Sequence, residues 1–238
     1  MEVSVVVAVK DEAGAIGGLI AEIIGALGPG NGYEVIIIDD GSSDGTVGVV
    51  RGVQAGEPRL HLLRHRRNHG QSAAVRTGVR SARGRLVVTL DGDGQNDPAD
   101  IPRLLAAYRA AGEPGVRLVT GRRARRQDTL IKRLSSRVAN TVRSWVLNDQ
   151  SRDSACGLKV IDRDVFLRLP YFNHMHRFLP ALVRREGFEV LAVDVNHRPR
   201  RSGASKYGTW DRLSAGVIDL AGVAWLQARR SAPEIVEP

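Results

Sequence analysis

The first half of the chain alternates short apolar runs with stretches of helical spacing. The apolar runs are rich in valine and isoleucine, which predicts strands buried on both faces of a sheet. Between them, apolar residues recur every three or four positions, as on one face of a helix. The predicted strands are Val3–Val9, Tyr33–Ile38, Leu60–Arg64, Leu86–Leu90 and Val116–Gly121, and the predicted helices are Ile16–Leu27, Thr46–Ala55, Ser72–Ala82 and Ala99–Ala110.

This alternation predicts an α/β fold with an open, mostly parallel sheet and helices on both faces, because strand–helix–strand units join parallel strands. Such a Rossmann-like layout is typical of nucleotide-binding domains. No G-x-G-x-x-G follows the first strand, and no G-x-x-x-x-G-K-[ST] occurs in the chain. Dinucleotide binding and P-loop chemistry are therefore disfavoured.

The second half is less regular. A basic segment, residues 122–148, takes on helical spacing from Leu130 onward. Two further strands are predicted at Gly157–Ile161 and Glu189–Val195, with a helix at Phe178–Arg185 between them.

A last helix is predicted at Trp210–Arg230. Its mostly apolar stretch of about twelve residues is shorter than the roughly 20 that span a bilayer. The helix packs in the core, packs in a dimer, or lies at a membrane surface with Trp225 at headgroup level. We expect one main domain, residues 1–208, followed by this helix and a tail, residues 209–238.

Composition fits a soluble globular protein, with 42% hydrophobic and 26% charged residues. The single cysteine, Cys156, cannot form an intramolecular disulfide, and we expect it to serve in packing. Because no secretory leader is evident at the start, we expect a reducing, cytoplasmic setting.

The formal net charge is +9, which favours an anionic partner. Nucleic acid is disfavoured, because aromatic residues make up only 5% of the chain and the basic runs alternate with acidic loops. The acidic stretch Asp91-Gly92-Asp93-Gly94-Gln95 follows a predicted buried strand. Carboxylates at the carboxyl end of a strand suit a divalent cation that bridges to phosphate, although an Asp/Gly turn is the plainer alternative.

Several segments, in order and spacing, resemble the family-2 inverting glycosyltransferases, and within them the polyprenyl-phosphate sugar transferases, which include dolichol-phosphate mannosyltransferase. The resemblance covers nearly the whole chain and is strong because so many ordered segments share it. The segments are Val5–Glu12, Ile38–Thr46, Asn68–Gly70, Asp91–Gln95, Gly121-Arg122, Ser136-Arg137, Asp153–Gly157, His176–Pro180 and Arg200–Tyr207.

The resemblance implies a GT-A fold, a nucleotide-diphosphate sugar donor such as GDP-mannose or a UDP-sugar, and Mg²⁺ or Mn²⁺ as cofactor. It implies catalytic roles for Asp91, Asp93 and Arg122, and metal ligands at Asp91, Asp93 and Gln95. The implied donor-binding residues are Ala8, Lys10, Glu12, Ile38, Asp40, Gly92, Arg200 and Lys206, and the implied acceptor-phosphate residues are Arg122, Lys132, Arg133 and Ser136.

Arg200 and Lys206 flank Gly203, which suits a basic loop that closes over a pyrophosphate. No general base is expected, because a phosphate monoester is already an oxyanion near neutral pH. His176 either takes part with Arg177 as in the family or caps the following helix. Ala8 and Lys10 depart from the family's usual proline and tyrosine, which leaves the stacking of the base and the identity of the nucleotide open.

We therefore expect metal-dependent, inverting transfer of a hexose to a polyprenyl phosphate such as undecaprenyl or dolichyl phosphate. The enzyme would work at the cytoplasmic face of the cell membrane, held peripherally, with a homodimer or a membrane-protein partner left open. The alternatives are a transferase of the same fold that acts on a hydroxyl of a glycan or protein, and a non-catalytic nucleotide-sugar-binding module.

Overall fold

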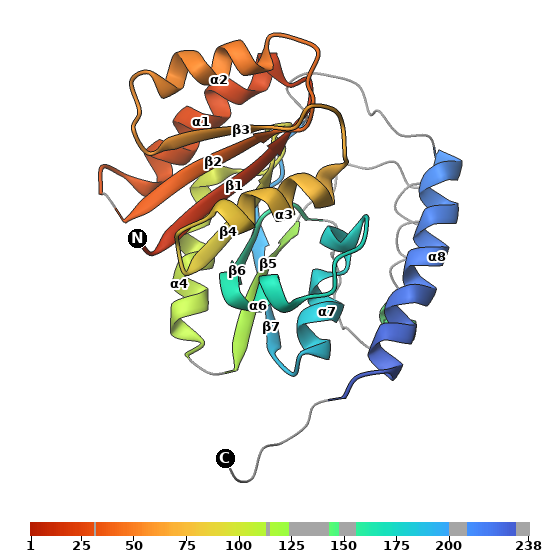
Figure 1. Ribbon diagram of the computed structural model, residues 1–238. Coiled ribbons are helices and arrows are strands. Elements are labelled where there is room, and N and C mark those ends of the chain that lie inside the picture. Colours follow the sequence, from red (N-terminus) through yellow and green to blue (C-terminus); the bar gives the residue numbers. More distant parts are fainter. Residues whose placement is uncertain (31, 113–114, 124–142, 148–155, 200–208, 232–238) are drawn as a thin grey trace, which may run out of the picture.

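A computed structural model describes residues 1–30, 32–112, 115–123, 143–147, 156–199 and 209–231, with side chains in the last range from Gly216 onward. One sheet runs through this part of the chain, covered by helices on both faces (Figure 1). Its strands are β1 (Val3–Val9), β2 (Tyr33–Asp39), β3 (Leu60–Arg64), β4 (Leu86–Asp91), β5 (Val116–Arg123), β6 (Lys159–Asp162) and β7 (Glu189–Val195). The helices are α1 (Ala13–Leu27), α2 (Thr46–Gln54), α3 (Gln71–Ser81), α4 (Ile101–Ala110), α6 (Arg163–Arg168), α7 (Leu179–Arg185) and α8 (Thr209–Ala228), with 3₁₀ turns η1 (Pro98–Asp100) and η2 (Met175–Arg177).

The strand order is β3-β2-β1-β4-β6-β5-β7. The pairs β1–β2, β2–β3, β1–β4 and β5–β7 are parallel, whereas β6 is antiparallel to both β4 and β5. Strand β5 therefore points the same way as β4, and six strands end at one edge of the sheet. The expectation of a mostly parallel α/β sheet is confirmed.

Two hydrophobic clusters fill the space between the sheet and the helices. Val5 and Val7 face the cluster that includes Ile16 and Ile20 of α1, while Val6 faces the cluster that includes Val75 of α3. This alternation follows from the two-residue period of a strand, and it explains why β1 is apolar throughout. The sheet is thereby packed against helices on both faces, which fixes the position of its carboxyl edge relative to α1 and α3.

The structure differs from the predictions mainly at boundaries. Helix α1 begins at Ala13 rather than Ile16, and β6 begins at Lys159 rather than Gly157. Helix α6 was not expected at all. It begins where the carboxylate of Asp162 accepts hydrogen bonds from the backbone N–H groups of Asp164 and Val165, which is an ordinary N-cap.

Helix α8 lies along one side of the molecule, beyond α7 (Figure 1). Val223 is buried against the second cluster, with Leu220, Ala224 and Leu226 partly buried beside it. Its opposite side is exposed at Val217, Ile218 and Trp225. Core packing therefore accounts for one face of this helix. Within the described residues, no helix has the length and apolar character needed to cross a membrane.

Candidate active site

The acidic motifs meet at the carboxyl edge of the sheet. Strands β2 and β3 lie on one side of β1 and β4 lies on the other, so the chain reverses its direction of winding between β1 and β4. The register places Ala8 of β1 between Ile38 of β2 and Asp91 of β4. In open α/β sheets, ligands bind in the crevice at this kind of switch point.

Asp91 is held on two sides. Its Oδ1 atom accepts a hydrogen bond of 2.5 Å from Nε2 of Gln71, the first residue of α3. On the other side lies Gly157, where a Cβ atom would come within 2.3 Å of Asp91 Oδ2. Only glycine leaves room for the carboxylate in this position.

The electrostatic environment of Asp91 is costly for an ionised carboxyl. Burial and the nearby charge of Asp93 raise the pKa of Asp91 to about 6, although buried Lys159 partly offsets them. The Lys159 ammonium also donates a hydrogen bond to the carbonyl oxygen of Cys156. The carboxylates of Asp91 and Asp93 thus lie close together, and the positive charge of Lys159 does not fully offset the effects that raise the pKa of Asp91.

The turn that follows Asp91 is compact. Asp93 Oδ1 accepts a 3.1 Å hydrogen bond from the backbone N–H of Gln95. The N–H of Gly92 donates to the carbonyl of Ala8, and a Cβ atom at Gly92 would lie 2.5 Å from a methyl group of Val9. In the described ranges no three His, Cys, Asp or Glu side chains cluster in a way that could hold a metal ion. A cation held by this turn would need further oxygen ligands from a bound molecule.

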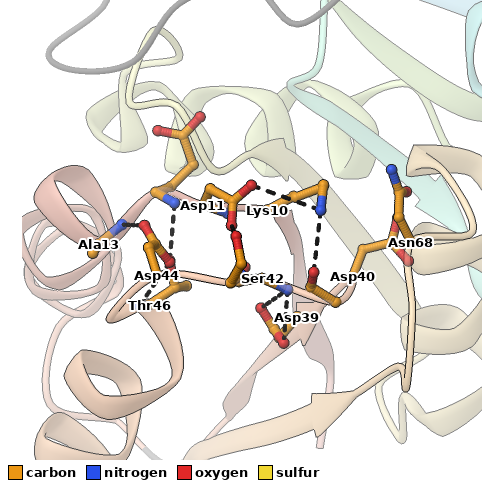
Figure 2. Close-up of polar contacts among 12 residues, drawn as sticks. Lys10, Asp11, Ala13, Asp39, Asp40, Ser42, Asp44, Thr46 and Asn68 are labelled. Atoms are coloured by element: carbon orange, nitrogen blue, oxygen red, sulfur yellow. Dashed lines mark hydrogen bonds and ion pairs between the residues drawn. The ribbon is translucent and has the colours of Figure 1, made fainter.

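The turns after β1 and β2 are joined by reciprocal hydrogen bonds (Figure 2). The backbone N–H groups of Asp11, Glu12 and Ala13 donate to side-chain oxygens from the turn after β2, at 2.8, 2.9 and 3.2 Å. The acceptors are Ser42, Thr46 and Asp44, respectively. In return, Asp11 accepts from the N–H of Ser43 at 2.7 Å, and the Lys10 ammonium donates to the carbonyl of Gly41 at 3.1 Å.

Asp39 and Asp40 have separate structural partners. Asp39 accepts hydrogen bonds from the N–H of Ser42 and from Arg64. Asp40 Oδ1 accepts from His65 Nδ1 at 2.7 Å and from the N–H of His69 at 2.9 Å, while Oδ2 accepts from the N–H of Gly70 at 2.8 Å. The buried carboxylate of Asp40 therefore fixes the loop that leads into α3.

The other predicted donor residues differ in exposure. Glu12 is buried, Lys10 is partly exposed, and the side chain of Ile38 lies wholly inside the second hydrophobic cluster. Ile38 can therefore reach a donor only through its backbone. Ala8 is partly buried at the edge of the same cluster.

Arg122 lies at the end of β5 and forms a 2.5 Å ion pair with Asp194 of β7. Both side chains are exposed, and the hydrogen bond from Arg122 lowers the pKa of Asp194. A phosphate bound here would compete with Asp194 for the guanidinium. Lys132, Arg133, Ser136, Arg200 and Lys206 lie outside the described residues. The chain just before Arg200 contacts the acidic turn, since the N–H of Arg198 donates to the carbonyl of Gln95 at 3.0 Å.

Two further expectations have clear outcomes. Cys156 is buried and packs beside Gly121, as expected for a packing role. His176 does not cap the following helix, because α7 has no side-chain cap. Its Nδ1 atom instead lies 2.7 Å from the hydroxyl of Ser72 in α3, a contact that joins residues 104 positions apart.

Residues 4–169 match the model of glycosyl transferase family 2. The chain belongs to this family. Among curated relatives, it is 32% identical over 238 residues to dodecaprenyl-phosphate galacturonate synthase of Rhizobium johnstonii. The alignment covers 98% of this chain and 69% of that protein. It is also 33% identical over 208 residues to undecaprenyl-phosphate 4-deoxy-4-formamido-L-arabinose transferase of Aeromonas hydrophila. That alignment covers 87% of this chain and 63% of the relative. The chain thus spans about two thirds of the length of these family members.

Solved structures share the fold of this family member. Glucosyl-3-phosphoglycerate synthase of Mycobacterium tuberculosis, in complex with Mn²⁺, UDP and its product, matches with a TM-score of 0.70 at 19% identity, over 97% of this chain and 81% of that one. Mannosyl-3-phosphoglycerate synthase of Rubrobacter xylanophilus matches with a TM-score of 0.72 at 21% identity, over 97% and 76%. The GT-A fold and the assignment as a glycosyltransferase are confirmed.

Proposed function

We propose that the chain transfers a hexose from a nucleotide-diphosphate sugar to a polyprenyl phosphate, with inversion and with a divalent cation. The observation that carries the proposal is the pair Asp91 and Asp93 at the switch point of the sheet. It is supported by curated relatives whose names specify dodecaprenyl and undecaprenyl phosphate as the sugar acceptors. The proposed donor is GDP-mannose or a UDP-sugar.

The residues at this edge fit Mg²⁺ or Mn²⁺. Mg²⁺ in such sites takes one or two carboxylates and completes its shell with waters and substrate phosphates, and the described residues offer two carboxylates and the amide of Gln95. The pKa of Asp91 is raised first by burial and then by repulsion from Asp93, and a bound cation would favour the ionised carboxylate against both effects. Structures of the same fold hold Mn²⁺ or Mg²⁺ together with UDP, which supports this choice. When bound, the cation would neutralise charge on the departing nucleotide diphosphate.

The remaining residues bind and orient. We propose that the basic residues Arg200 and Lys206 contact the donor's pyrophosphate, and that Arg122, Lys132, Arg133 and Ser136 receive the acceptor phosphate. Arg198 donates its N–H to the carbonyl of Gln95 and pairs with Glu22 and Asp97 at 2.6 Å, and this contact with the acidic turn two residues before Arg200 supports the donor-binding role proposed for Arg200. An acceptor that is already an oxyanion needs no general base. We also propose peripheral attachment at the cytoplasmic face of the membrane.

The test is transfer of labelled sugar by the purified protein. The protein is incubated with Mg²⁺ or Mn²⁺, a panel of UDP- and GDP-sugars, and undecaprenyl phosphate. We expect an acid-labile product that extracts into organic solvent, and its loss in Asp93→Ala with the thermal transition retained. Failure with every donor would refute the lipid acceptor, and full activity of Asp93→Ala would refute the metal role.

A further inference from the structure

The start of α3 contacts the first acidic residue of the site directly. Gln71 is the first residue of α3, and Asp91 is the last residue of β4. The 2.5 Å contact joins the Gln71 amide nitrogen to Asp91 Oδ1, because an ionised carboxylate can only accept a hydrogen bond. The contact therefore links α3, which packs against β1 and β2, to β4 on the other side of β1.

Gln71 limits the freedom of the Asp91 carboxylate. The missing side chain of Gly157 leaves a slot for Oδ2, and the amide of Gln71 takes one lone pair of Oδ1. Rotation of the carboxylate would break the hydrogen bond on one side or drive an oxygen into the Gly157 backbone on the other. Partners that orient a metal-binding side chain in this way raise its affinity for the metal.

The helix start that carries Gln71 is itself fixed. Gly70, with a φ of 87°, donates its N–H to Asp40. On the other side of Gln71, the Ser72 hydroxyl is hydrogen-bonded to His176 Nδ1 at 2.7 Å and accepts a 3.3 Å hydrogen bond from the N–H of His176. Burial lowers the pKa of His176 well below 6.5, which keeps the ring neutral and able to accept. Gln71 is therefore presented on a rigid support rather than on a loose loop.

We propose that Gln71 is a positioning residue, which orients the carboxylate of Asp91 for binding of a divalent cation and its nucleotide diphosphate. This inference rests on the proposed function. The ligand class is Mg²⁺ or Mn²⁺ together with a nucleoside diphosphate. The effect of Gln71 reaches the cation only through Asp91.

The experiment measures Mn²⁺ binding to the full chain from the electron paramagnetic resonance signal of free Mn²⁺, with UDP or GDP present. Gln71→Ala removes the hydrogen bond, and we expect the dissociation constant for Mn²⁺ to rise by about tenfold or more. Gln71→Glu keeps the volume but places a carboxylate against Asp91, so we expect a loss at least as large. The matched control is Gln54→Ala in α2, which removes a side-chain hydrogen bond of 3.0 Å to Leu60, remote from Asp91 in the fold.

The outcomes separate the two proposals. Wild-type affinity in both Gln71 variants would overturn the positioning role and leave the proposed function intact. Tolerance of Gln71→Glu with a loss in Gln71→Ala would also overturn it, because packing alone would then explain the effect. If the wild-type protein bound no Mn²⁺ with either nucleotide, that result would contradict both the proposed metal dependence and the positioning role of Gln71. Thermal transitions check that all variants are folded.

Discussion

At the scale of single residues, the environment of Asp91 disfavours its ionised form. Its pKa is raised from 3.8 to about 6, mainly by burial and then by the charge of Asp93. Between these two pH values the native state binds more protons at this site than the unfolded state does. The free energy of unfolding therefore falls as pH rises through this range.

Replacing Asp91 by asparagine should stabilise the metal-free protein above pH 6. The neutral amide keeps an oxygen for Gln71 and removes the buried charge, and the shift corresponds to a gain of at most about 3 kcal/mol. Chemical denaturation at pH 4 and pH 7 with a chelator present measures it. The gain should be larger at pH 7, and the exposed control Asp164→Asn should show no such difference. An Asp91→Asn protein that is no more stable than wild type at pH 7 contradicts this account.

Gly157 offers a second test at this scale. Gly157→Ala places a methyl group within 2.3 Å of Asp91 Oδ2, so the carboxylate must move. We expect the catalytic rate to fall by about a hundredfold, the order that a small misplacement of a reacting group costs. The matched control is Gly25→Ala in α1, where a Cβ atom meets nothing within 4 Å and alanine favours the helix. Equal activity of the two variants would show that the slot at Gly157 is unimportant.

At the scale of elements, the turns after β1 and β2 behave as one unit. Asp44 accepts hydrogen bonds from the N–H and hydroxyl of Thr46 and from the N–H of Ala13. Desolvation is the largest single effect on the pKa of Asp44 and raises it, but these hydrogen bonds together outweigh desolvation and lower the pKa. We expect Asp44→Ala to destabilise the fold by about 1 kcal/mol and to loosen Lys10 and Glu12. Because the folded pKa is lowered, wild type should lose this advantage only as pH falls below 3.8.

The measurement is thermal unfolding of wild type and Asp44→Ala at pH 7 and pH 3. The control is Ser43→Ala, which removes an exposed hydroxyl but keeps the N–H that donates to Asp11. We expect a clear difference for Asp44→Ala at pH 7 that narrows at pH 3. A difference that stays the same at both pH values would mean that the charge of Asp44 contributes nothing.

Most elements could be predicted from the sequence because their signals are local. Strands β1, β3 and β7 have the predicted bounds, since each is an apolar or alternating run closed by turn residues. The position of β6 between β4 and β5 could not be predicted, because it depends on pairing with segments that lie more than 35 residues away along the chain, as in the pairs Leu86–Asp162 and Leu118–Ile161. Helix α6 was missed because six residues show too little periodicity, although Asp162 is a recognisable N-cap.

At the scale of the whole molecule, the sequence predicted which strand ends carry the acidic residues but not what surrounds their carboxylates. Asp91 and Asp40 lie at the carboxyl edge as the strand–turn pattern predicts. Their partners Gln71, Gly157 and His65 come from distant parts of the chain, and only the folded sheet brings them together. The same holds for Arg122, whose ion pair with Asp194 depends on the register between β5 and β7.

The last prediction concerns the exposed side of α8. Val217, Ile218 and Trp225 are 62%, 72% and 60% exposed, at spacings that place them on one helix face. Trp145, 83% exposed, lies in the neighbouring segment 143–147, because Gln227 of α8 donates a 3.0 Å hydrogen bond to Leu147. Exposed apolar side chains with Trp, beside the exposed pair Arg229 and Arg230, are typical of a surface that rests on anionic lipid.

We therefore expect the double variant Trp145→Ser with Trp225→Ser to bind vesicles of phosphatidylglycerol and phosphatidylethanolamine about tenfold more weakly, a loss of about 1.4 kcal/mol. Leu167→Ser is the matched control, because Leu167 is 40% exposed on α6, away from this surface. Co-sedimentation at low and high salt separates the apolar contribution, which should persist, from that of Arg229 and Arg230, which salt should screen. If the double variant and Leu167→Ser bound as wild type does, this face would not meet the membrane, and a second protein would become its better partner.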